Sequence, residues 1–326
     1  MSGQVAMRFR WIGRAALLCP LVLACGDAAT EPVVVGTNIW PGYEPLYLAQ
    51  ARGLVSGKDI RLIQYPSASE VIRGFHNGVI SAAAVTLDEA LLMSANGLPI
   101  KVVLVFDASR GGDVILGRAN VNHLEELAGR KVGTEASALG AFVLCRAAEL
   151  HGLDCRRDFT VVNLEVNEHE NAFAAGAIDA VVTFEPVRTR LIAGGARVLF
   201  DSREIPNEII DVLVVRDDTL ARRSRQVRAL VRGWFAALDY IKLNRAESIA
   251  IMGQREQLSA EQFDEALSGL QIPDRLENLA LIGGERPKLL QTAPNLVRIM
   301  LEHGLLPRPA NIDGLVDRSV LEAALQ

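Results

Sequence analysis

The chain has 326 residues and a formal net charge of -5, and half of its residues are hydrophobic. This length accommodates two domains of ordinary size, and the composition is that of a folded globular protein. The acidic balance excludes an extended nucleic-acid surface, which requires a basic face, so we expect no nucleic-acid partner.

The N-terminal 24 residues have the layout of an export signal. Basic residues up to Arg14 precede an apolar run from Ala15 to Ala24, which is too short for an ordinary membrane-spanning helix. The next residue is Cys25, and the preceding Val-Leu-Ala resembles the lipobox of bacterial lipoproteins, in which the cysteine becomes the lipidated first residue. Ordinary signal cleavage near Ala29 is the alternative. We predict a lipoprotein-type signal peptide over 1–24 and lipidation of Cys25.

The only cysteines after the signal region are Cys145 and Cys155, ten residues apart. In the oxidising compartment to which an export signal leads, disulfides persist, so these two residues form either a disulfide or two buried thiols. Because the chain has few cysteines and no close Cys/His pairing, we predict no metal site.

Two segments of about a hundred residues repeat the same order of features. The ranges 33–54 and 130–153 each read as a strand ending in Val-Gly-Thr, a turn, and an amphipathic helix closed by Gly-Leu. The ranges 74–109 and 172–202 each read as a short apolar strand ending in Thr, a helix, and a strand ending in Phe-Asp. This alternation predicts an α/β fold of two lobes with mostly parallel sheets.

Aromatic and small polar residues gather at the predicted strand ends, where sheets of this kind bind their ligands. For each serine among them the alternative is helix capping alone, and for Trp40 and Tyr43 the alternative is a place in the core. Their convergence at the strand ends favours a ligand site. The candidate ligand-binding residues are Asn38, Trp40, Tyr43, Ser67, Ser69, Thr86, Asp88, Ser109, Glu135, Ser137, Phe184 and Glu185.

Three segments, 38–54, 65–91 and 181–202, resemble the extracytoplasmic substrate-binding proteins of ABC importers. Within that group they resemble the branch that binds nitrate, sulfonates, taurine and thiamine precursors. The resemblance implies a type II periplasmic binding protein: two α/β lobes that close on a ligand, a hinge of two crossings and a helical C-terminal extension. It places the first lobe at 33–110 plus 213–326, the second at 111–212, and the crossings near 108–116 and 208–216.

The resemblance also implies a monomer with no cofactor, which binds a small solute and delivers it to a permease whose ATPase is a separate chain. With the lipid anchor, this places the protein in the periplasm or at the outer face of the cytoplasmic membrane. A ligand sensor for a membrane receptor is an alternative, because it needs the same two-lobed clamp.

The predicted loops are rich in acids and contain one basic residue, Arg110. An anion beside an unmatched carboxylate is unfavourable at low dielectric, so a zwitterion, an amine or a neutral nitrogen heterocycle is the favoured ligand. Acids that point to solvent or cap helices are the alternative interpretation. A pyrimidine-synthase-like enzyme, which uses its own histidine and a lysine-bound pyridoxal phosphate, is disfavoured because the histidines and lysines lie outside these loops.

Overall fold

The computed structural model describes residues 1–4, 31–135 and 139–326. The chain divides into a unit over residues 1–30 and a unit over residues 31–326, and the second contains all the elements below. Cys25, Ser137 and most of the predicted signal peptide lie outside the described residues. Within the described residues, helices with the length and apolar character needed to cross a membrane are absent.

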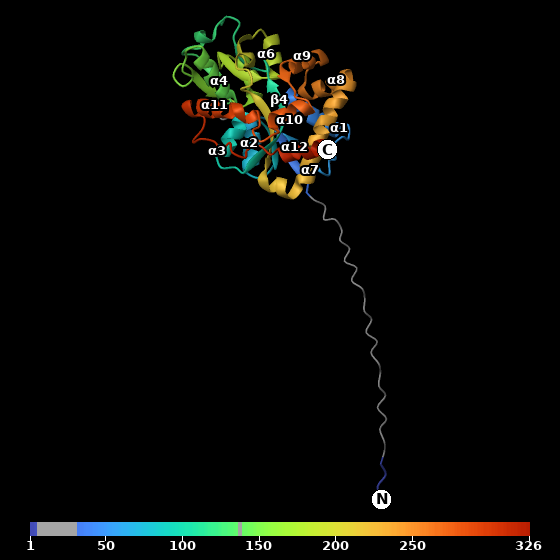
Figure 1. The fold of residues 1–326 in the computed structure, drawn as a ribbon. Coiled ribbons are helices and arrows are strands. Elements are labelled where there is room, and N and C mark those ends of the chain that lie inside the picture. Colours follow the sequence, from blue (N-terminus) through green and yellow to red (C-terminus); the bar gives the residue numbers. More distant parts are fainter. Residues whose placement is uncertain (5–30, 136–138) are drawn as a thin grey trace. The chain divides into compact units, whose positions relative to one another are not determined.

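Two β-sheets form the centre of the second unit (Figure 1). Sheet A has the strand order β11-β4-β10-β3-β1-β2, and sheet B has the order β7-β6-β8-β5-β9. The strands of sheet A are β1 (Val33–Thr37), β2 (Ile60–Gln64), β3 (Ala82–Thr86), β4 (Ile100–Ser109), β10 (Ile210–Arg216) and β11 (Leu270–Gln271). Those of sheet B are β5 (Asp113–Gly117), β6 (Lys131–Thr134), β7 (Thr160–Asn163), β8 (Ala180–Phe184) and β9 (Arg197–Asp201). We call each sheet with its helices the A half and the B half.

The chain crosses between the sheets twice, from β4 to β5 and from β9 to β10. Each crossing delivers a strand that is inserted antiparallel: β10 lies between β3 and β4, and β5 lies between β8 and β9. The prediction of mostly parallel sheets was therefore wrong, since only the β1–β2, β1–β3, β6–β7 and β6–β8 pairs are parallel among the described strands. The repeat pattern covers the strands within each half. It contains no information about β5 and β10, the strands that follow the two crossings and run antiparallel to their neighbours.

Twelve α-helices surround the sheets among the described residues. The helices before the second crossing are α1 (Glu44–Ala51), α2 (Ala68–His76), α3 (Leu87–Ala95), α4 (Leu139–Leu150), α5 (His169–Ala174) and α6 (Val187–Ala193). Those after it are α7 (Asp217–Leu243), α8 (Arg245–Glu256), α9 (Ala260–Ser268), α10 (Arg275–Ile282), α11 (Leu289–Glu302) and α12 (Arg318–Leu325). These confirm the predicted α/β class and the helical C-terminal extension.

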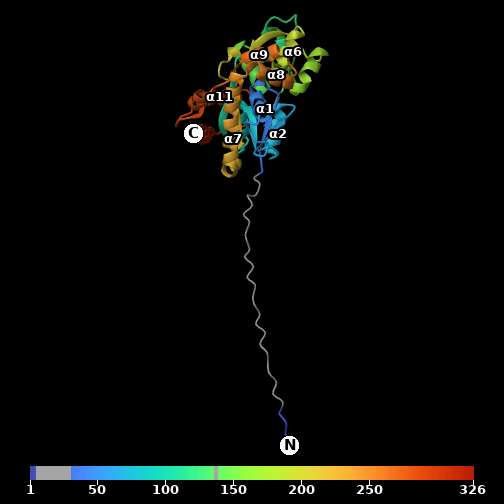
Figure 2. The same cartoon turned by 90° about the vertical axis from the view of Figure 1, so that its right-hand side faces the viewer.

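The C-terminal helices pack mainly on the A half. The long helix α7 contacts α1, α12, β1 and β10, and Figure 2 shows it standing beside α1. Its apolar stripe is buried because residues at three- and four-residue spacing share one helix face. Trp234 on that stripe is fully buried against the ring of Phe106, with ring centroids 4.8 Å apart, so it belongs to the core.

Cys145 on α4 and Cys155 in the loop beyond it are joined by a disulfide. Of the two alternatives that the spacing left open, the structure contains the disulfide. Cys155 Sγ lies 3.7 Å from Nδ1 of His303, at the end of α11.

Candidate functional site

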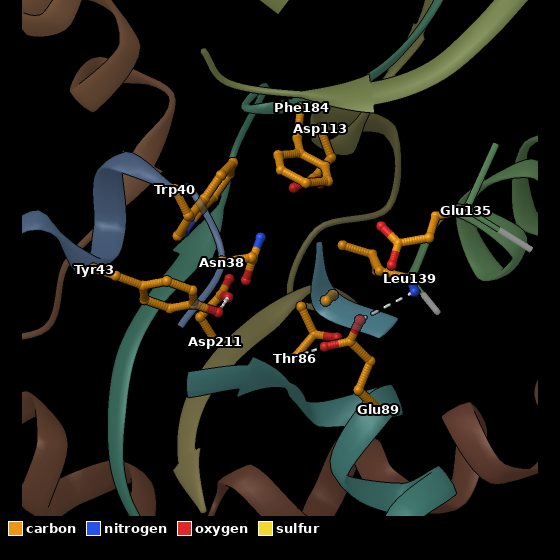
Figure 3. A pocket seen from close by; sticks show the side chains of 12 residues that line it. Asn38, Trp40, Tyr43, Thr86, Glu89, Asp113, Glu135, Leu139, Phe184 and Asp211 are labelled. Carbon is orange, nitrogen blue, oxygen red and sulfur yellow. Dashed lines mark hydrogen bonds between the residues drawn. The ribbon is translucent and has the colours of Figure 1, made fainter. Parts of the chain in front are cut away.

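A small cavity lies where the carboxyl ends of strands from sheets A and B face each other (Figure 3). Its volume of about 30 Å³ is room for roughly two water molecules. Both halves contribute to its wall. The lining residues are Asn38, Trp40, Tyr43, Ala68, Thr86, Glu89, Asp113, Glu135, Leu139, Gly140, Phe184 and Asp211.

One end of the cavity is aromatic. Trp40 follows β1 in the A half, and Phe184 ends β8 in the B half. Their ring centroids are 5.8 Å apart and the rings are nearly perpendicular, at 81°. Figure 3 shows both rings at the cavity wall. Trp40 is only 4% exposed, so the aromatic turn after β1 is both part of the core and part of the cavity wall.

Behind this wall lies a group of carboxyl groups on adjacent strands of sheet A. Asp211 on β10 is paired with Thr86 on β3 and with Asp107 on β4. The hydroxyl of Tyr43 donates a hydrogen bond to Asp211, and Nε1 of Trp40 donates to Oδ2 of Asp107 at 3.2 Å. Burial raises the pKa of Asp107 to about 7, and burial together with the charge of Asp107 raises the pKa of Asp211 well above its usual range.

Two further acids lie on elements of opposite halves. Asp113 begins β5 and is paired with Phe184 on β8. Its Oδ2 is buried without a hydrogen-bond partner, and burial raises its pKa to about 7. Glu89 lies in the first turn of α3, and burial followed by the charge of Asp88 raises its pKa to about 8. An empty cavity of this kind therefore retains protons that exposed acids release near pH 4.

The fourth lining acid, Glu135, follows β6 in the B half and reaches the A half. Its Oε1 accepts a hydrogen bond of 2.6 Å from the backbone N–H of Ser69, in the first turn of α2. Burial raises the pKa of this carboxyl group as well. The contact joins the two halves directly across the cavity.

Lysine, arginine and histidine are absent from the twelve described residues that line the cavity. The nearby arginines are engaged elsewhere: Arg188 pairs with Glu185 at 2.8 Å, and Arg190 pairs with Glu170 at 2.7 Å. Four carboxyl groups thus surround a small space, and no described basic side chain in its wall balances them.

Six of the sequence-predicted residues line this cavity, namely Asn38, Trp40, Tyr43, Thr86, Glu135 and Phe184. Five others are buried or partly buried nearby but do not line it. The hydroxyl of Ser67 caps α2 by accepting from the N–H of Glu70, and Ser69 donates to Glu135 through its backbone. The hydroxyl of Ser109 lies 2.8 Å from that of Ser202 at the crossings.

The remaining two predicted acids, Glu185 and Asp88, are also buried and do not line the cavity. Glu185 accepts hydrogen bonds from Arg188 and from the backbone of Thr189, which satisfies both carboxylate oxygens. Asp88 is 2% exposed, and burial raises its pKa to about 6.

The sequence reasoning missed three lining acids: Glu89, Asp113 and Asp211. Asp113 and Asp211 lie in the crossing segments, which were interpreted only as hinges. An aspartate within an otherwise apolar β-branched strand is a signal that could have found Asp211, since a buried carboxyl group is costly without a role. Glu89 lies three residues beyond a predicted strand end and was counted only as part of a helix.

A larger cavity of about 410 Å³ lies elsewhere, between β4, β10, α10 and α11. Its wall is mostly apolar, with residues such as Val105 and Leu289, and it has few polar groups converging on one point. Convergent polar groups at strand ends identify a solute site better than volume does, so the smaller cavity is the candidate site.

The whole fold is similar to solved structures of solute-binding proteins. The alkanesulfonate-binding protein SsuA from Xanthomonas axonopodis pv. citri, bound to MOPS, is 18% identical with a TM-score of 0.76, covering 89% of this chain and all of that chain. The periplasmic aliphatic sulphonate binding protein SsuA from Escherichia coli is 19% identical with a TM-score of 0.71, covering 88% of this chain and 92% of that one.

The same fold also occurs in an enzyme. The desulfurization enzyme DSZB is 16% identical with a TM-score of 0.63, covering 90% of this chain and 98% of that chain. These likenesses confirm the predicted periplasmic-binding-protein fold. Comparison with curated protein sequences finds no match. Residues 26–255, more than half of the chain, match the model of the NMT1-like family, and the chain therefore belongs to the NMT1-like family.

Proposed function

We propose that this protein binds a small nitrogen compound, an amine or a nitrogen heterocycle with several N–H donors, in the cavity between its two halves. The observation that carries the proposal is the acidic wall, in which Glu89, Asp113, Glu135 and Asp211 converge without a described basic partner. Oδ2 of Asp113 supports it further, because a buried acceptor without a partner is satisfied by a donating ligand.

Electrostatics decide between this class and an oxyanion. Two unit charges 4 Å apart interact with about 4 kcal/mol at an effective dielectric of ~20, which is on the order of a thousandfold in affinity. An ionised carboxyl group in the wall therefore opposes a sulfonate or nitrate and favours an ammonium or amidinium by a similar amount. The relatives that bind sulfonates share the fold, and the fold does not determine the charge of the ligand.

The aromatic end of the cavity adds shape selection. The rings of Trp40 and Phe184 come from opposite halves, so a flat ligand between them contacts both halves at once. Such contacts exist only in the closed state, and only contacts of that kind shift the balance toward closure. We infer that two lobes with the bounds expected from the sequence, 33–110 plus 213–326 and 111–212, move apart about the two crossings to admit a ligand larger than the 30 Å³ cavity.

A ligand screen tests this proposal. Purified protein is heated at pH 7.5 with benzamidinium, 4-aminopyrimidine, taurine, methanesulfonate or nitrate, and Kd values of hits are measured by calorimetry. We expect stabilisation by the nitrogen compounds, since a ligand at 100 times its Kd adds about 2.7 kcal/mol to folding. Stabilisation by methanesulfonate or nitrate and by neither nitrogen compound would contradict the proposal.

We propose further that the protein is exported, anchored by lipid at Cys25 and paired with an ABC permease in solute import. The Val-Leu-Ala-Cys sequence and the family's fold support this proposal. In cells expressing the full chain, labelled palmitate should be incorporated into the wild-type protein and not into Cys25→Ser. Equal labelling of both, or labelling of neither, would contradict the lipid anchor.

A further inference from the structure

Two helix N-termini point at the candidate site, and each is occupied by a carboxylate from the opposite half. Helix α2 has nine residues and belongs to the A half, and helix α4 has twelve and belongs to the B half. Glu135 of the B half accepts from α2, and Glu89 of the A half accepts from α4. Figure 3 shows both glutamates at the end of the cavity away from Trp40.

The contact at α2 is the shorter. Oε1 of Glu135 is 2.6 Å from the backbone nitrogen of Ser69, and hydrogen bonding by Ser69 and Ser67 partly offsets the rise that burial causes in the pKa of Glu135. Glu135 is 3% exposed. Its carboxyl group therefore occupies a position that a helix N-terminus offers to any oxyanion, beside a backbone N–H group and the positive end of the helix dipole.

The contact at α4 repeats this arrangement in the opposite direction. Oε1 of Glu89 accepts from the backbone nitrogen of Leu139 at 3.3 Å, and its Oε2 accepts from the nitrogen of Thr86 at 2.9 Å. Glu89 is also 3% exposed. One oxygen of this carboxyl group thus holds its own helix, α3, and the other holds the first described residue of α4.

An independent observation shows what is left for a ligand. Oδ2 of Asp113 belongs to a residue that lines the cavity, is 3% exposed and has no hydrogen-bond partner. The protein's own carboxyl groups accept from backbone N–H groups at the two helix N-termini, which are the positions that could hold an anion. Among the described lining residues, the buried polar atoms without a partner are Oδ2 of Asp113 and the hydroxyl of Thr86. Oδ2 of Asp113 requires a donor, and the Thr86 hydroxyl can donate or accept.

We propose that Glu135 and Glu89 determine ligand specificity: they act as built-in occupants of the two helix N-termini and so exclude oxyanions from the cleft. The inference rests on the proposed function, because it explains how a fold shared with sulfonate-binding proteins takes a donor-rich nitrogen compound. Truncating either side chain vacates a helix N-terminus and removes an acidic group from the wall at once.

Methanesulfonate and benzamidinium are the probes, and their Kd values are measured by calorimetry with wild type, Glu135→Ala and Glu135→Gln. We expect the alanine variant to bind methanesulfonate at least tenfold more tightly than wild type, since charge-assisted hydrogen bonds to the freed donors become available. The glutamine variant should gain less, because its amide oxygen still accepts from Ser69. The matched control is Glu70→Ala, which removes a partly exposed glutamate from the same first turn of α2.

Several outcomes overturn the inference. One is no gain of methanesulfonate affinity in Glu135→Ala; others are an equal gain in Glu70→Ala or in Glu135→Gln. Glu89→Ala is the second test if Glu135→Ala does not fold, and it carries the same expectation for α4. Failure of the proposed function has a different signature, since wild type would then fail to bind benzamidinium and 4-aminopyrimidine whatever methanesulfonate does in the variants.

Discussion

Replacing Asp113 by Asn should make the empty protein less sensitive to pH. Burial raises the pKa of Asp113 to about 7 from its usual 3.8, with the charges of Asp88 and Glu185 adding to the effect of burial. The folded protein therefore keeps a proton that the unfolded chain has released between pH 4 and 7. Stability falls as pH rises through this window, because the folded state binds more protons than the unfolded state.

The structure sets the size of this effect. One proton held only by the folded state gives a slope of about 1.36 kcal/mol per pH unit. Over the interval from 3.8 to about 7 the contribution of Asp113 is ~4 kcal/mol, an upper bound because water entering the cavity lowers the cost of its charge. Asparagine cannot ionise, so between pH 5 and 7 the plot of unfolding free energy against pH should lack the contribution of about one proton in the variant.

Urea unfolding of ligand-free protein at pH 5, 6, 7 and 8 measures this slope for wild type and Asp113→Asn. The control is Asp239→Asn. A hydrogen bond from Arg275 lowers the pKa of Asp239, so this carboxyl group is ionised in both states throughout the range and its loss leaves the slope unchanged. Identical slopes for wild type and Asp113→Asn would refute the assignment of a buried, proton-retaining carboxyl group to the cavity wall.

Three further measurements test the cavity wall and the disulfide. Affinity for benzamidinium should rise between pH 6 and 8 by up to tenfold per pH unit, because the bound cation displaces the proton of Asp113. The rise should be less steep in Asp113→Asn. A calorimetric Kd that does not change with pH would contradict this. Trp40→Phe removes the donor to Asp107 and should lower the free energy of unfolding by ~1–3 kcal/mol, whereas unchanged urea midpoints would show that water replaces the indole. Replacing Cys145 and Cys155 together by Ala removes a cross-link that closes a ten-residue loop, and should lower the free energy of unfolding by about 2.5–3 kcal/mol in thermal and urea experiments. If reducing the disulfide of the wild-type protein left its stability unchanged, this prediction would be wrong.

The local elements were predictable because their signals are contained in short stretches of chain. Ser67 is followed three residues later by a glutamate, and the structure uses its hydroxyl to cap α2. The apolar runs before Asn38 and after Ser81 are strands of the same sheet, and the aromatic turn that follows β1 reaches the cavity. Such features depend on backbone geometry and side-chain spacing within about ten residues, and the neighbouring half has little influence on them.

The charge of the site was decided by tertiary structure. Asp211 lines the cavity because the second crossing inserts β10 between β3 and β4, which places its side chain beside Thr86 and Asp107. Glu89 and Glu135 accept hydrogen bonds across the gap from residues that are 50 and 66 positions away in the chain. The sequence by itself determined the strands, the helices and the strand ends that bear the site. Which carboxyl groups meet there depends on strand insertion and on how the halves face each other, because burial and opposing charges exist only once the chain has folded.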